Sequence, residues 1–511
     1  MQEHAVHSKP HPSRSRPPLR QVAVGLAVAL ALALAGCAVG PDFKTPVLPK
    51  AADAPYTETP LQAETVSAHG DRVGPSGVGQ RLINGQDLPA EWWKLFRSEP
   101  LDQLIRAALE HNPTLDAAQA ALRQAQENYN AAAGTTYYPS ANLQLGGGRQ
   151  RAILSGSTPN EFNVYSGTIG VSYTLDLFGG ERRQLESLMA AADYQRFQTE
   201  AAYQTLIGNV VTTAVQEAAL RGQLEATREL LKAQETQLRI AEKQVELGAQ
   251  PRAVALTQGT LVAQTRAQLP PLEKALAQTR HQLAVLAGRF PGEGGLPEFH
   301  LESLRLPDAL PVSLPSALAR QRPDIRASEA LLHQASAQVG VATANQYPQI
   351  TLNGSYGTQH TVLPTMDIGN TLWGVTAGLT QPLFNGGALS AKRRAAEAAY
   401  QQAEAQYRAT VLKAFQNVAD SLRAIDADAL ALRAQADAEA KARESLDVNT
   451  RQYKLGGISY LALLDAQRSY QQARIGLIQA QAARYSDTAA LFLALGGGWW
   501  NHPAATGQTG G

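Results

Sequence analysis

The stretch QPLFNGGALSAKRR, residues 381–394, joins two patterns of different period. Its first half ends a segment in which apolar and polar residues alternate, which predicts a β-strand. Its second half opens a proline-free stretch of 67 residues, Leu389 to Leu455, which predicts a very long α-helix. LDLFGGERRQ, residues 175–184, makes the same change before a proline-free stretch of 67 residues, Glu181 to Leu247. The chain therefore changes twice from a strand to a long helix.

An internal repeat explains why the change occurs twice. Four pairs of landmarks recur in the same order, at offsets of 206 to 210 residues: Asn112-Pro113 with Arg322-Pro323, Tyr138-Pro139 with Tyr347-Pro348, Leu177-Phe178 with Leu383-Phe384, and Leu247-Gly248 with Leu455-Gly456. Self-similarity at a fixed period indicates repeated structural units. We therefore predict two similar units, 100–290 and 310–497, each with a helix, two strands, a long helix and a returning helix.

The predicted strands have one apolar and one polar face. The apolar positions of the segment 164–178 are Tyr165, Ile169, Val171, Tyr173, Leu175 and Leu177. The other apolar positions are Ala141, Leu143 and Leu145 in the first strand, Ile350, Leu352 and Tyr356 in the third, and Trp373, Val375, Ala377 and Leu379 in the fourth. Alternation over about ten residues is what a transmembrane barrel strand needs. A soluble sandwich alternates equally well, but four strands are too few to bury a sandwich core.

Four strands are also too few to close a barrel, because the smallest common barrels have eight. The open edges of the sheet must then pair with further copies of the chain. Three copies supply twelve strands. The strand count alone does not exclude an assembly of two or four copies.

Each long helix ends in a glycine. Gly248 and Gly456 suit the residue after a helix end, which commonly adopts a positive φ. The chain is then expected to turn back, which makes two antiparallel helical hairpins with tight tips. Pro270-Pro271 lies in the first returning helix and is expected to break or kink it.

The N-terminus has the order of a secretory signal. Basic residues between 9 and 20 precede an apolar run of 14 residues, Val22 to Ala35, which is too short for an ordinary transmembrane helix. LAGC, residues 34–37, resembles the bacterial lipobox, in which the cysteine is lipidated. We therefore predict a signal peptide at 1–36, acylated Cys37 as the mature N-terminus, and a lipidated extended segment at 37–99. A plain signal peptide with an incidental cysteine is the alternative.

Composition and motifs exclude several classes of function. The chain carries 45 Lys and Arg against 44 Asp and Glu, which argues against nucleic-acid binding because a basic excess would then be expected. The sequence contains no phosphate-binding loop, no nucleophile elbow, no zinc-protease motif and no cluster of Cys and His. We predict no enzymatic activity, no cofactor and no metal.

Six stretches carry a family resemblance: GCAVGPDFKTP (36–46), WWKLFRSEPLDQLI (92–105), NPTLDAAQA (112–120), QPLFNGG (381–387), YKLGGISYLALLDAQRS (453–469) and ALGGGW (494–499). They resemble the outer-membrane efflux proteins, the TolC-like outer membrane factors, in the lipoprotein branch that serves resistance-nodulation-division pumps. The resemblance implies an α+β membrane protein. It would be a homotrimer whose twelve-stranded outer-membrane β-barrel, four strands per chain, continues into a long periplasmic α-helical barrel with an equatorial belt.

The resemblance also implies a function and partners. The protein would be the outer-membrane exit duct of a tripartite efflux pump, exporting drugs or other small molecules and contributing to antibiotic resistance. The hairpin tips around Gly248, Gly456 and Gly457 would dock to a periplasmic adaptor, the membrane-fusion protein, and an inner-membrane pump. A soluble periplasmic coiled-coil lipoprotein or adaptor is the alternative, and the paired alternating strands weigh against it.

Residues after the second tip form a candidate constriction. Leu461, Asp465 and Arg468 stand at i, i+4 and i+7 and share one face of the returning helix. The resemblance places a tunnel constriction here, and Tyr453 is assigned to the same network. Alternatively, Leu461 packs between helices while Asp465 and Arg468 form an ordinary solvated pair. The sequence gives no path for 70–89, predicts a disordered tail at 498–511, and does not indicate the cargo.

Overall fold

The computed structural model describes residues 38–47, 55–152, 160–363 and 366–501. The chain divides into two compact units. Unit 1 comprises Met1–Phe43, Asn128–Met189 and His333–Gln401, and unit 2 comprises Lys44–Glu127, Ala190–Leu332 and Gln402–Gly511. Among the described residues, no helix combines the length and the apolar character needed to cross a membrane. The signal peptide and Cys37 lie outside the described residues.

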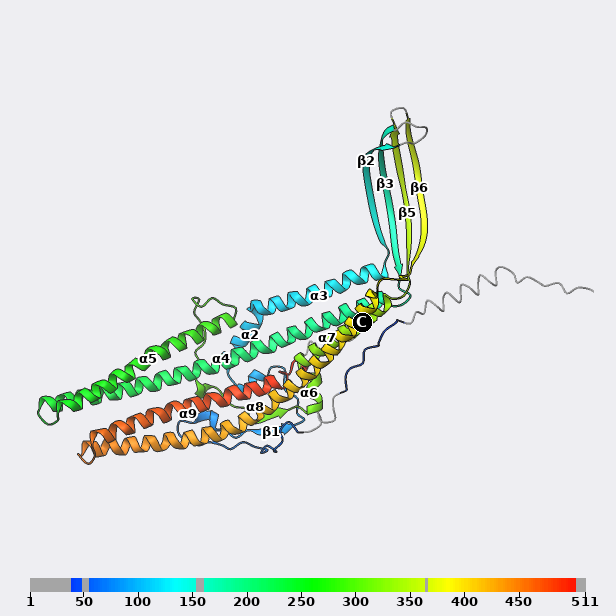
Figure 1. Ribbon diagram of the computed structural model, residues 1–511. Helices are drawn as coiled ribbons and strands as arrows, with labels where there is room; N and C mark the ends of the chain where they lie inside the picture. The colour runs from blue at the N-terminus through cyan, green and yellow to red at the C-terminus, as the bar shows by residue number, and fades with distance from the viewer. Residues whose placement is uncertain (1–37, 48–54, 153–159, 364–365, 502–511) are drawn as a thin grey trace, which may run out of the picture. The chain divides into compact units, whose positions relative to one another are not determined.

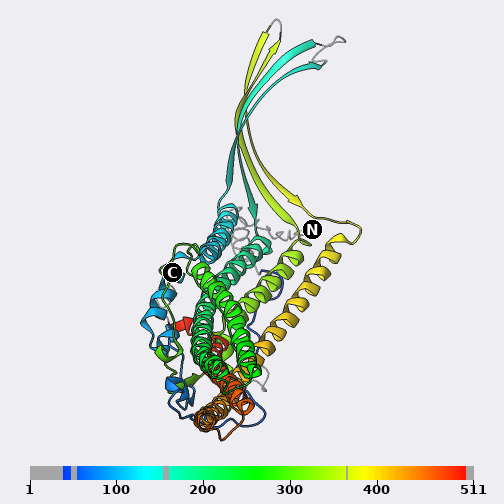
Figure 2. The ribbon, with the colours of Figure 1, turned by 90° about the vertical axis from the view of Figure 1, so that its left-hand side faces the viewer.

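Unit 1 contains a four-stranded antiparallel sheet in the order β2-β3-β5-β6. Its strands are β2 (Ser140–Ala152), β3 (Asn160–Leu175), β5 (Gln349–Leu363) and β6 (Met366–Thr380). Figures 1 and 2 show them as a long, twisted ribbon with β2 and β6 at its edges. All four predicted strands are confirmed, and the pairing of β3 with β5 joins the two repeats.

One face of this sheet is apolar and exposed. Leu143 lies opposite Ile169, Ile169 opposite Tyr356, and Tyr356 opposite Trp373, so one apolar row crosses all four strands. All four side chains are exposed in the single chain. The period-two pattern of the sequence therefore becomes a continuous apolar surface, because the register keeps like faces together.

The first strand-to-helix change occurs earlier than the sequence suggested. β3 ends at Leu175, so the predicted strand 164–178 is too long at this end. The Asp176 carboxylate instead accepts hydrogen bonds from the backbone nitrogens of Glu181, at 3.2 Å, and Arg182, at 2.9 Å. A carboxylate at a helix N-terminus satisfies amides that have no partner in the helix. Leu177 therefore lies in the turn and not in the strand.

Residues 39–43 are held against the rest of unit 1 by several contacts. The Val39 nitrogen donates to the Phe178 carbonyl at 3.0 Å, immediately after β3. Arg183, whose side chain is buried, pairs with Asp42 at 2.6 Å and with Glu186 at 2.7 Å. Phe43 stacks on His333 with ring centroids 4.3 Å apart. This short segment therefore has a defined binding site beside the strand-to-helix turn.

The helices confirm the predicted lengths. Both long helices, α4 (Gly180–Glu246) and α8 (Ala388–Lys454), have 67 residues, and both returning helices, α5 (Arg252–Leu286) and α9 (Tyr460–Ala494), have 35. The leading helix of each repeat is divided in two, as α2 (Glu99–His111) with α3 (Pro113–Tyr137) and as α6 (Pro315–Gln321) with α7 (Pro323–Ala344). In Figure 1, α5 lies along α4 and α9 along α8.

Pro270-Pro271, where a break or kink was expected, does not break the helix. α5 runs through both prolines, which lie on an exposed part of the helix. Each proline removes one helical hydrogen bond. Water can satisfy the freed carbonyls at this surface, while buried contacts hold the helix on either side at Val262 and Leu283.

The core of unit 2 lies between α8, α9 and the N-terminal segment. Six apolar positions of α8, spaced three or four residues apart, are buried: Tyr407, Val411, Ala414, Val418, Leu422 and Ile425. Trp92 of η3 (Trp92–Phe96) packs on Phe492 with ring centroids 5.5 Å apart.

The structure supplies a path for residues 70–89 that the sequence left open. They form η2 (Gly74–Gly77) and β1 (Arg81–Asn84), and β1 pairs in parallel with β4 (Ala309–Val312). The other 3₁₀ helices among the described residues are η3, η4 (Leu301–Ser303) and η5 (Trp499–Asn501).

The assignment of 498–511 to a disordered tail is wrong at its start. Trp499 Nε1 donates to the Gln321 carbonyl at 2.6 Å, and Asn501 Nδ2 donates to the Leu88 carbonyl at 2.8 Å. These contacts hold η5 against unit 2. The remaining residues, 502–511, lie outside the described ranges.

Candidate functional site

Both helical hairpins turn through the same glycine motif. After α4, the Ala249 nitrogen donates to the Gln244 carbonyl at 2.8 Å, and Gly248 has a φ of +73°. After α8, the Gly457 nitrogen donates to the Gln452 carbonyl at 2.8 Å, and Gly456 has a φ of +76°. This is the Schellman pattern, which favours glycine at the positive-φ position. A Cβ built at Gly248 or Gly456 meets nothing within 4 Å, so both tips are open surfaces.

The second tip is closed by two tyrosines. The rings of Tyr453, at the end of α8, and Tyr460, at the start of α9, lie 5.4 Å apart. The Ser459 hydroxyl caps α9 by accepting from the Ala462 nitrogen at 3.3 Å. Burial raises the pKa of the Tyr453 phenol, which keeps it neutral. Within one chain Tyr453 therefore packs across the tip, and the structure does not bring it into the Asp465–Arg468 pair.

The three constriction candidates share an exposed face of α9. Leu461 is 64% exposed, so the alternative in which it packs between helices of the same chain does not hold. Arg468 Nη1 lies 3.4 Å from Asp465 Oδ1, and both side chains are mostly exposed. Leu463, Leu464, Ala466 and Gln467 occupy the buried side of the same turns. The pair is a solvated i,i+3 pair in one chain, and Leu461 remains free for a contact outside it.

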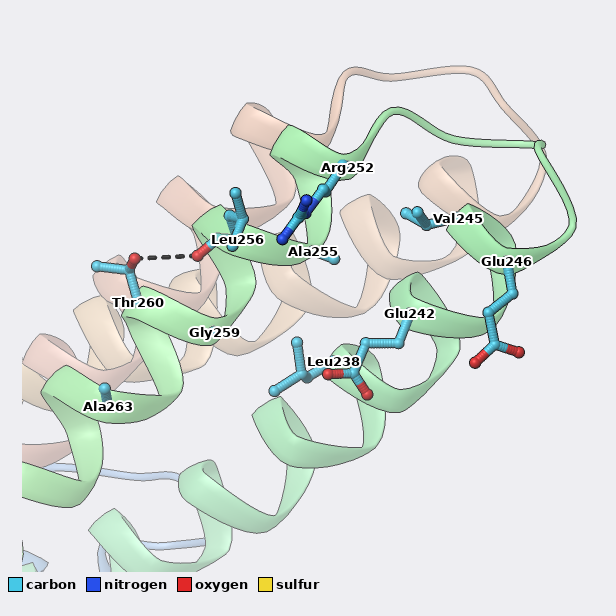
Figure 3. Close-up of a pocket in the computed structure, with 10 residues that line it drawn as sticks. All are labelled: Leu238, Glu242, Val245, Glu246, Arg252, Ala255, Leu256, Gly259, Thr260 and Ala263. Atoms are coloured by element: carbon cyan, nitrogen blue, oxygen red, sulfur yellow. Dashed lines mark hydrogen bonds between the residues drawn. The ribbon is translucent and has the colours of Figure 1, made fainter.

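The first tip contains a groove where the second has its tyrosines. The groove has a volume of about 690 Å³ and is lined by ten residues: Leu238, Glu242, Val245, Glu246, Arg252, Ala255, Leu256, Gly259, Thr260 and Ala263. Figure 3 shows these residues, with Arg252 and Leu256 on α5 and with Leu238 and Glu242 on α4. With the offset of 208 residues that relates Leu247-Gly248 to Leu455-Gly456, Val245 corresponds to Tyr453 and Arg252 corresponds to Tyr460 in the second repeat. Smaller or flexible side chains thus leave open the space that the tyrosines fill.

The same offset shows that the constriction candidates are absent from the first repeat. Ala253, Thr257 and Thr260 stand where the second repeat has Leu461, Asp465 and Arg468. A ring built from identical chains would therefore carry one such leucine and one such ion pair per chain. The first hairpin contributes only small or neutral side chains at these positions.

Sequence reasoning missed a buried arginine on α9. Arg484 is 1% exposed, and its Nη1 donates to the carbonyls of Ser76, at 2.7 Å, and Val78, at 3.0 Å. Its Nη2 donates to Gln80 Oε1 at 2.9 Å and to Thr65 Oγ1 at 3.4 Å. Burial lowers the pKa of Arg484 to about 10, so it stays charged at neutral pH. The available signal was that Arg484 and Asp487 are the only charged residues between Ile475 and Phe492.

A carboxyl pair lies close to this arginine. Asp428 of α8 shares a side-chain hydrogen bond with Asp487 of α9. Burial, together with this neighbouring carboxyl, raises the pKa of Asp428 to about 7, and the Arg484 charge opposes the rise. Two adjacent carboxyls cannot both ionise without repulsion, so one proton is retained near neutral pH.

Replacing Asp428 with asparagine should stabilise the helical unit at pH 8 by about 1–2 kcal/mol, after discounting for solvent screening. Between pH 4 and 7 the folded parent holds a proton that the unfolded chain has released. The parent's stability therefore falls as pH rises through this window and is level above it. Asparagine stays neutral, so the advantage of Asp428→Asn should shrink as pH falls toward 4. Thermal unfolding in detergent from pH 4 to 8 measures it. Asp437→Asn, at an exposed α8 carboxylate, is the control, and a parent that gains stability from pH 5 to 8 would contradict the prediction.

Neither tip has the features of a catalytic or metal site. In the part of the chain that the structure describes, no three His, Cys, Asp or Glu side chains are grouped so as to hold a metal ion. What the arrangement offers is surface: two open tips, an exposed face with one ion pair, and an exposed apolar sheet.

Known proteins match most of the chain. A family model described as outer membrane efflux protein matches residues 104–289 and 314–497, which correspond to the two repeats. The pyoverdine export outer membrane protein OpmQ of Pseudomonas putida is 32% identical over 423 residues, 81% of this chain and 89% of the relative. The toluene efflux pump outer membrane protein TtgF of Pseudomonas putida is 30% identical over 495 residues, 93% of this chain and 97% of the relative.

A solved structure agrees with the fold. The outer-membrane channel OprN superposes with a TM-score of 0.78 at 27% identity, covering 91% of this chain and 100% of that chain. The α+β fold class with four strands per chain, predicted from the sequence, is thereby confirmed. The roles assigned to Leu461, Asp465, Arg468 and the tip glycines stay predictions.

Proposed function

Because the chain belongs to the outer membrane efflux protein family, and is therefore an efflux channel and not an enzyme, we propose that it is the exit duct of a tripartite pump. The observation that carries this proposal is the combination of an exposed apolar sheet with two long helical hairpins that end in open tips. A soluble periplasmic lipoprotein or adaptor would have no use for such a sheet face. Small molecules would pass through the duct from the periplasm to the exterior.

The duct is a homotrimer in this proposal. The sheet has two unpaired edges, β2 and β6, and such edges pair with other strands unless they are protected. Three chains give the twelve strands that the family resemblance implies. The exposed apolar row from Leu143 to Trp373 would then face lipid, and the opposite face would line the lumen.

A lipid anchor at Cys37 completes the outer-membrane attachment. Val39 is hydrogen bonded to Phe178, at the turn where β3 leaves the sheet. Cys37 is two residues before Val39, so acyl chains on it would start near the level at which the apolar sheet begins. An anchor at this height supports the proposal, because the acyl chains and the apolar strands would enter the same leaflet.

The tips meet the partners in the periplasm. A periplasmic adaptor and an inner-membrane resistance-nodulation-division pump are the partners that the proposal requires. Gly248 and Gly456 form open, tight turns, and Gly457 follows Gly456 in the second turn, so another helical tip can be placed closely against them. The groove beside the first tip offers a recess with two carboxylates, Glu242 and Glu246, for such a partner. In the resting state the face with Leu461 would close the tunnel, and docking would open it.

Replacing Gly456 with tryptophan should abolish efflux while the protein still assembles. The bulky side chain would occupy open space at the tip and strain a positive-φ turn, so a partner could no longer approach closely. Drug susceptibility of cells whose only channel is the variant measures efflux. We expect the minimum inhibitory concentration to fall to that of cells without the channel.

Gly294→Trp is the matched control, because Gly294 also has a positive φ, of +68°, and open space at its Cβ, but lies far from the tips in sequence. It should leave efflux intact. Native mass spectrometry of the parent and of both variants gives the number of subunits and the acyl mass on Cys37. Unchanged susceptibility with Gly456→Trp would remove the tip from the docking surface, and a monomeric, non-acylated parent would overturn the proposed duct.

A further inference from the structure

Two exposed aromatic residues flank the open edges of the sheet. Tyr138 lies two residues before β2 and is 71% exposed, and Phe384 lies four residues after β6 and is 91% exposed. β2 and β6 are the two outer strands, with β3 and β5 between them (Figure 1). Each aromatic side chain therefore stands beside a strand edge that has no partner in the chain.

The internal repeat supplies a template for these edges. The counterparts of Phe384 and Tyr138 are Phe178 and Tyr347, which lie after β3 and before β5. These two rings are stacked, with centroids 4.7 Å apart and an interplanar angle of 21°. The stack forms where the first repeat pairs with the second, at the β3–β5 seam.

In the proposed duct, β6 of one chain meets β2 of the partner subunit. We propose that this seam copies the antiparallel register of the seam between the repeats, and that Phe384 stacks on Tyr138 of the partner subunit. This inference rests on the proposed oligomeric duct. It adds the pairing register and the residues that specify it. The occupant of each open edge is a second copy of this chain, because the same sequence elements already make this contact within one chain.

The template predicts one particular register. Tyr173 lies opposite Leu352 in the β3–β5 seam. The landmark offsets equate Tyr173 with Leu379 and Leu352 with Leu143. Leu379 should therefore lie opposite Leu143 of the partner subunit.

Two features of the sheet agree with this register. Leu379 and Leu143 are 65% and 67% exposed and belong to the same apolar face, so the apolar row continues across the seam. Following paired residues from Ser140 through Ser172, Asn353 and Thr376 leads to Gly146 of the partner subunit. One passage across the four strands thus shifts the pairing from Ser140 to Gly146 along β2. Because this shift is an even number of residues, apolar side chains stay on the apolar face of the sheet. The shift has the same direction in every subunit, as a closed barrel of tilted strands requires.

A register displaced by two residues is the competing arrangement. The hairpins of the two repeats differ by such a displacement. In the first repeat, Ser140 lies opposite Ser172. In the second repeat, the counterparts of these residues are Gln349 and Gly378, but Gln349 lies opposite Thr380. In that case Leu379 would face Ala141 or Leu145 of the partner subunit. Both arrangements keep the apolar face outward, so an experiment must separate them.

Cysteine pairs at the seam distinguish the registers. Full-length chains carrying Leu379→Cys with Leu143→Cys should form covalent oligomers under mild oxidation in membranes about tenfold faster than chains carrying Leu379→Cys with Ala141→Cys or Leu145→Cys. The parent chain controls for Cys37. Faster reaction of either displaced pair would overturn the register while leaving the proposed duct intact. A chain that is monomeric in membranes would overturn both.

A double-mutant cycle tests the aromatic stack. Phe384→Ala and Tyr138→Ala should each speed dissociation of the oligomer in detergent several-fold, and the double variant should be little faster than either single variant. Phe384→Ala combined with Tyr347→Ala should instead multiply the two single effects, because Tyr347 stacks on Phe178 within the chain. Multiplicative effects of Phe384→Ala and Tyr138→Ala would overturn the stack.

Discussion

Replacing Arg484 with leucine should destabilise the segment 65–80 by about 3–4 kcal/mol, since several buried acceptors would lose their donor together. The guanidinium reaches two carbonyls, Ser76 and Val78, and two side chains, Gln80 and Thr65. Leucine fills part of the space but donates nothing, and buried acceptors without partners are costly. The segment makes a continuous hydrogen-bonded path beside α9, because Gln481 also donates to the Val73 carbonyl at 2.8 Å.

Hydrogen exchange of the full chain in detergent measures this effect. The Ala68 amide, which donates to the Gly77 carbonyl, should exchange about 100- to 1,000-fold faster in Arg484→Leu, which corresponds to about 3–4 kcal/mol. Arg484→Lys should show an intermediate effect, because a lysine ammonium keeps the charge but lacks the planar fork.

Arg239→Leu is the matched control, since Arg239 lies on an exposed face of α4. It should leave exchange in 65–80 unchanged. If Arg484→Leu exchanges like the parent, another contact holds this segment, and the buried arginine is then only a tolerated charge.

The elements that the sequence predicted well are those with a long, regular period. Sixty-seven proline-free residues leave few alternatives to a long helix, and strict alternation from Tyr165 to Leu175 leaves few alternatives to a strand. The tip glycines were predictable because the Schellman turn demands a positive φ at Gly248 and Gly456. Local chemistry determines each of these features.

The features that the sequence did not predict depend on distant partners. β1 and β4 are short strands more than two hundred residues apart, and four residues such as RLIN carry no usable period. The Arg484 contacts bring together residues separated by about four hundred positions. Pro270 and Pro271 mark a helix break by local rules, but packing on either side overrode them.

The proposed gate belongs to a third class of feature, which depends on contacts with another copy of the chain. Sequence placed Leu461, Asp465 and Arg468 on one face, and the structure leaves that face exposed in the single chain. If the face turns toward the axis of a trimer, three carboxylates converge and would repel unless each is paired. Arg468, on the same chain or the neighbouring one, can pair with Asp465. The first repeat has Ala253, Thr257 and Thr260 at these positions, so it would not contribute to such a latch.

Removing the leucine and the carboxylate together, as Leu461→Ala with Asp465→Ala, should favour the open channel by about 30-fold. Exposed ion pairs contribute about 0–1 kcal/mol each, so three copies that separate together sum to about 2 kcal/mol, which corresponds to that factor. Mean conductance in planar bilayers should rise, and cells should become more sensitive to large antibiotics that enter through an open duct. Because all three side chains are exposed in the single chain, the substitutions should leave its fold intact.

Leu430→Ala with Glu444→Ala is the matched control for the gate, because it removes an exposed leucine and an exposed carboxylate from α8 instead of α9. Leu430 is exposed, and Glu444 pairs with Lys441 at 3.2 Å in the same i,i+3 geometry as Asp465 with Arg468. This control should conduct like the parent. A Leu461→Ala, Asp465→Ala channel that is trimeric and also conducts like the parent would mean that the face does not line the tunnel. In that case the Asp465–Arg468 pair is a solvated surface pair, and Leu461 serves the packing of neighbouring subunits.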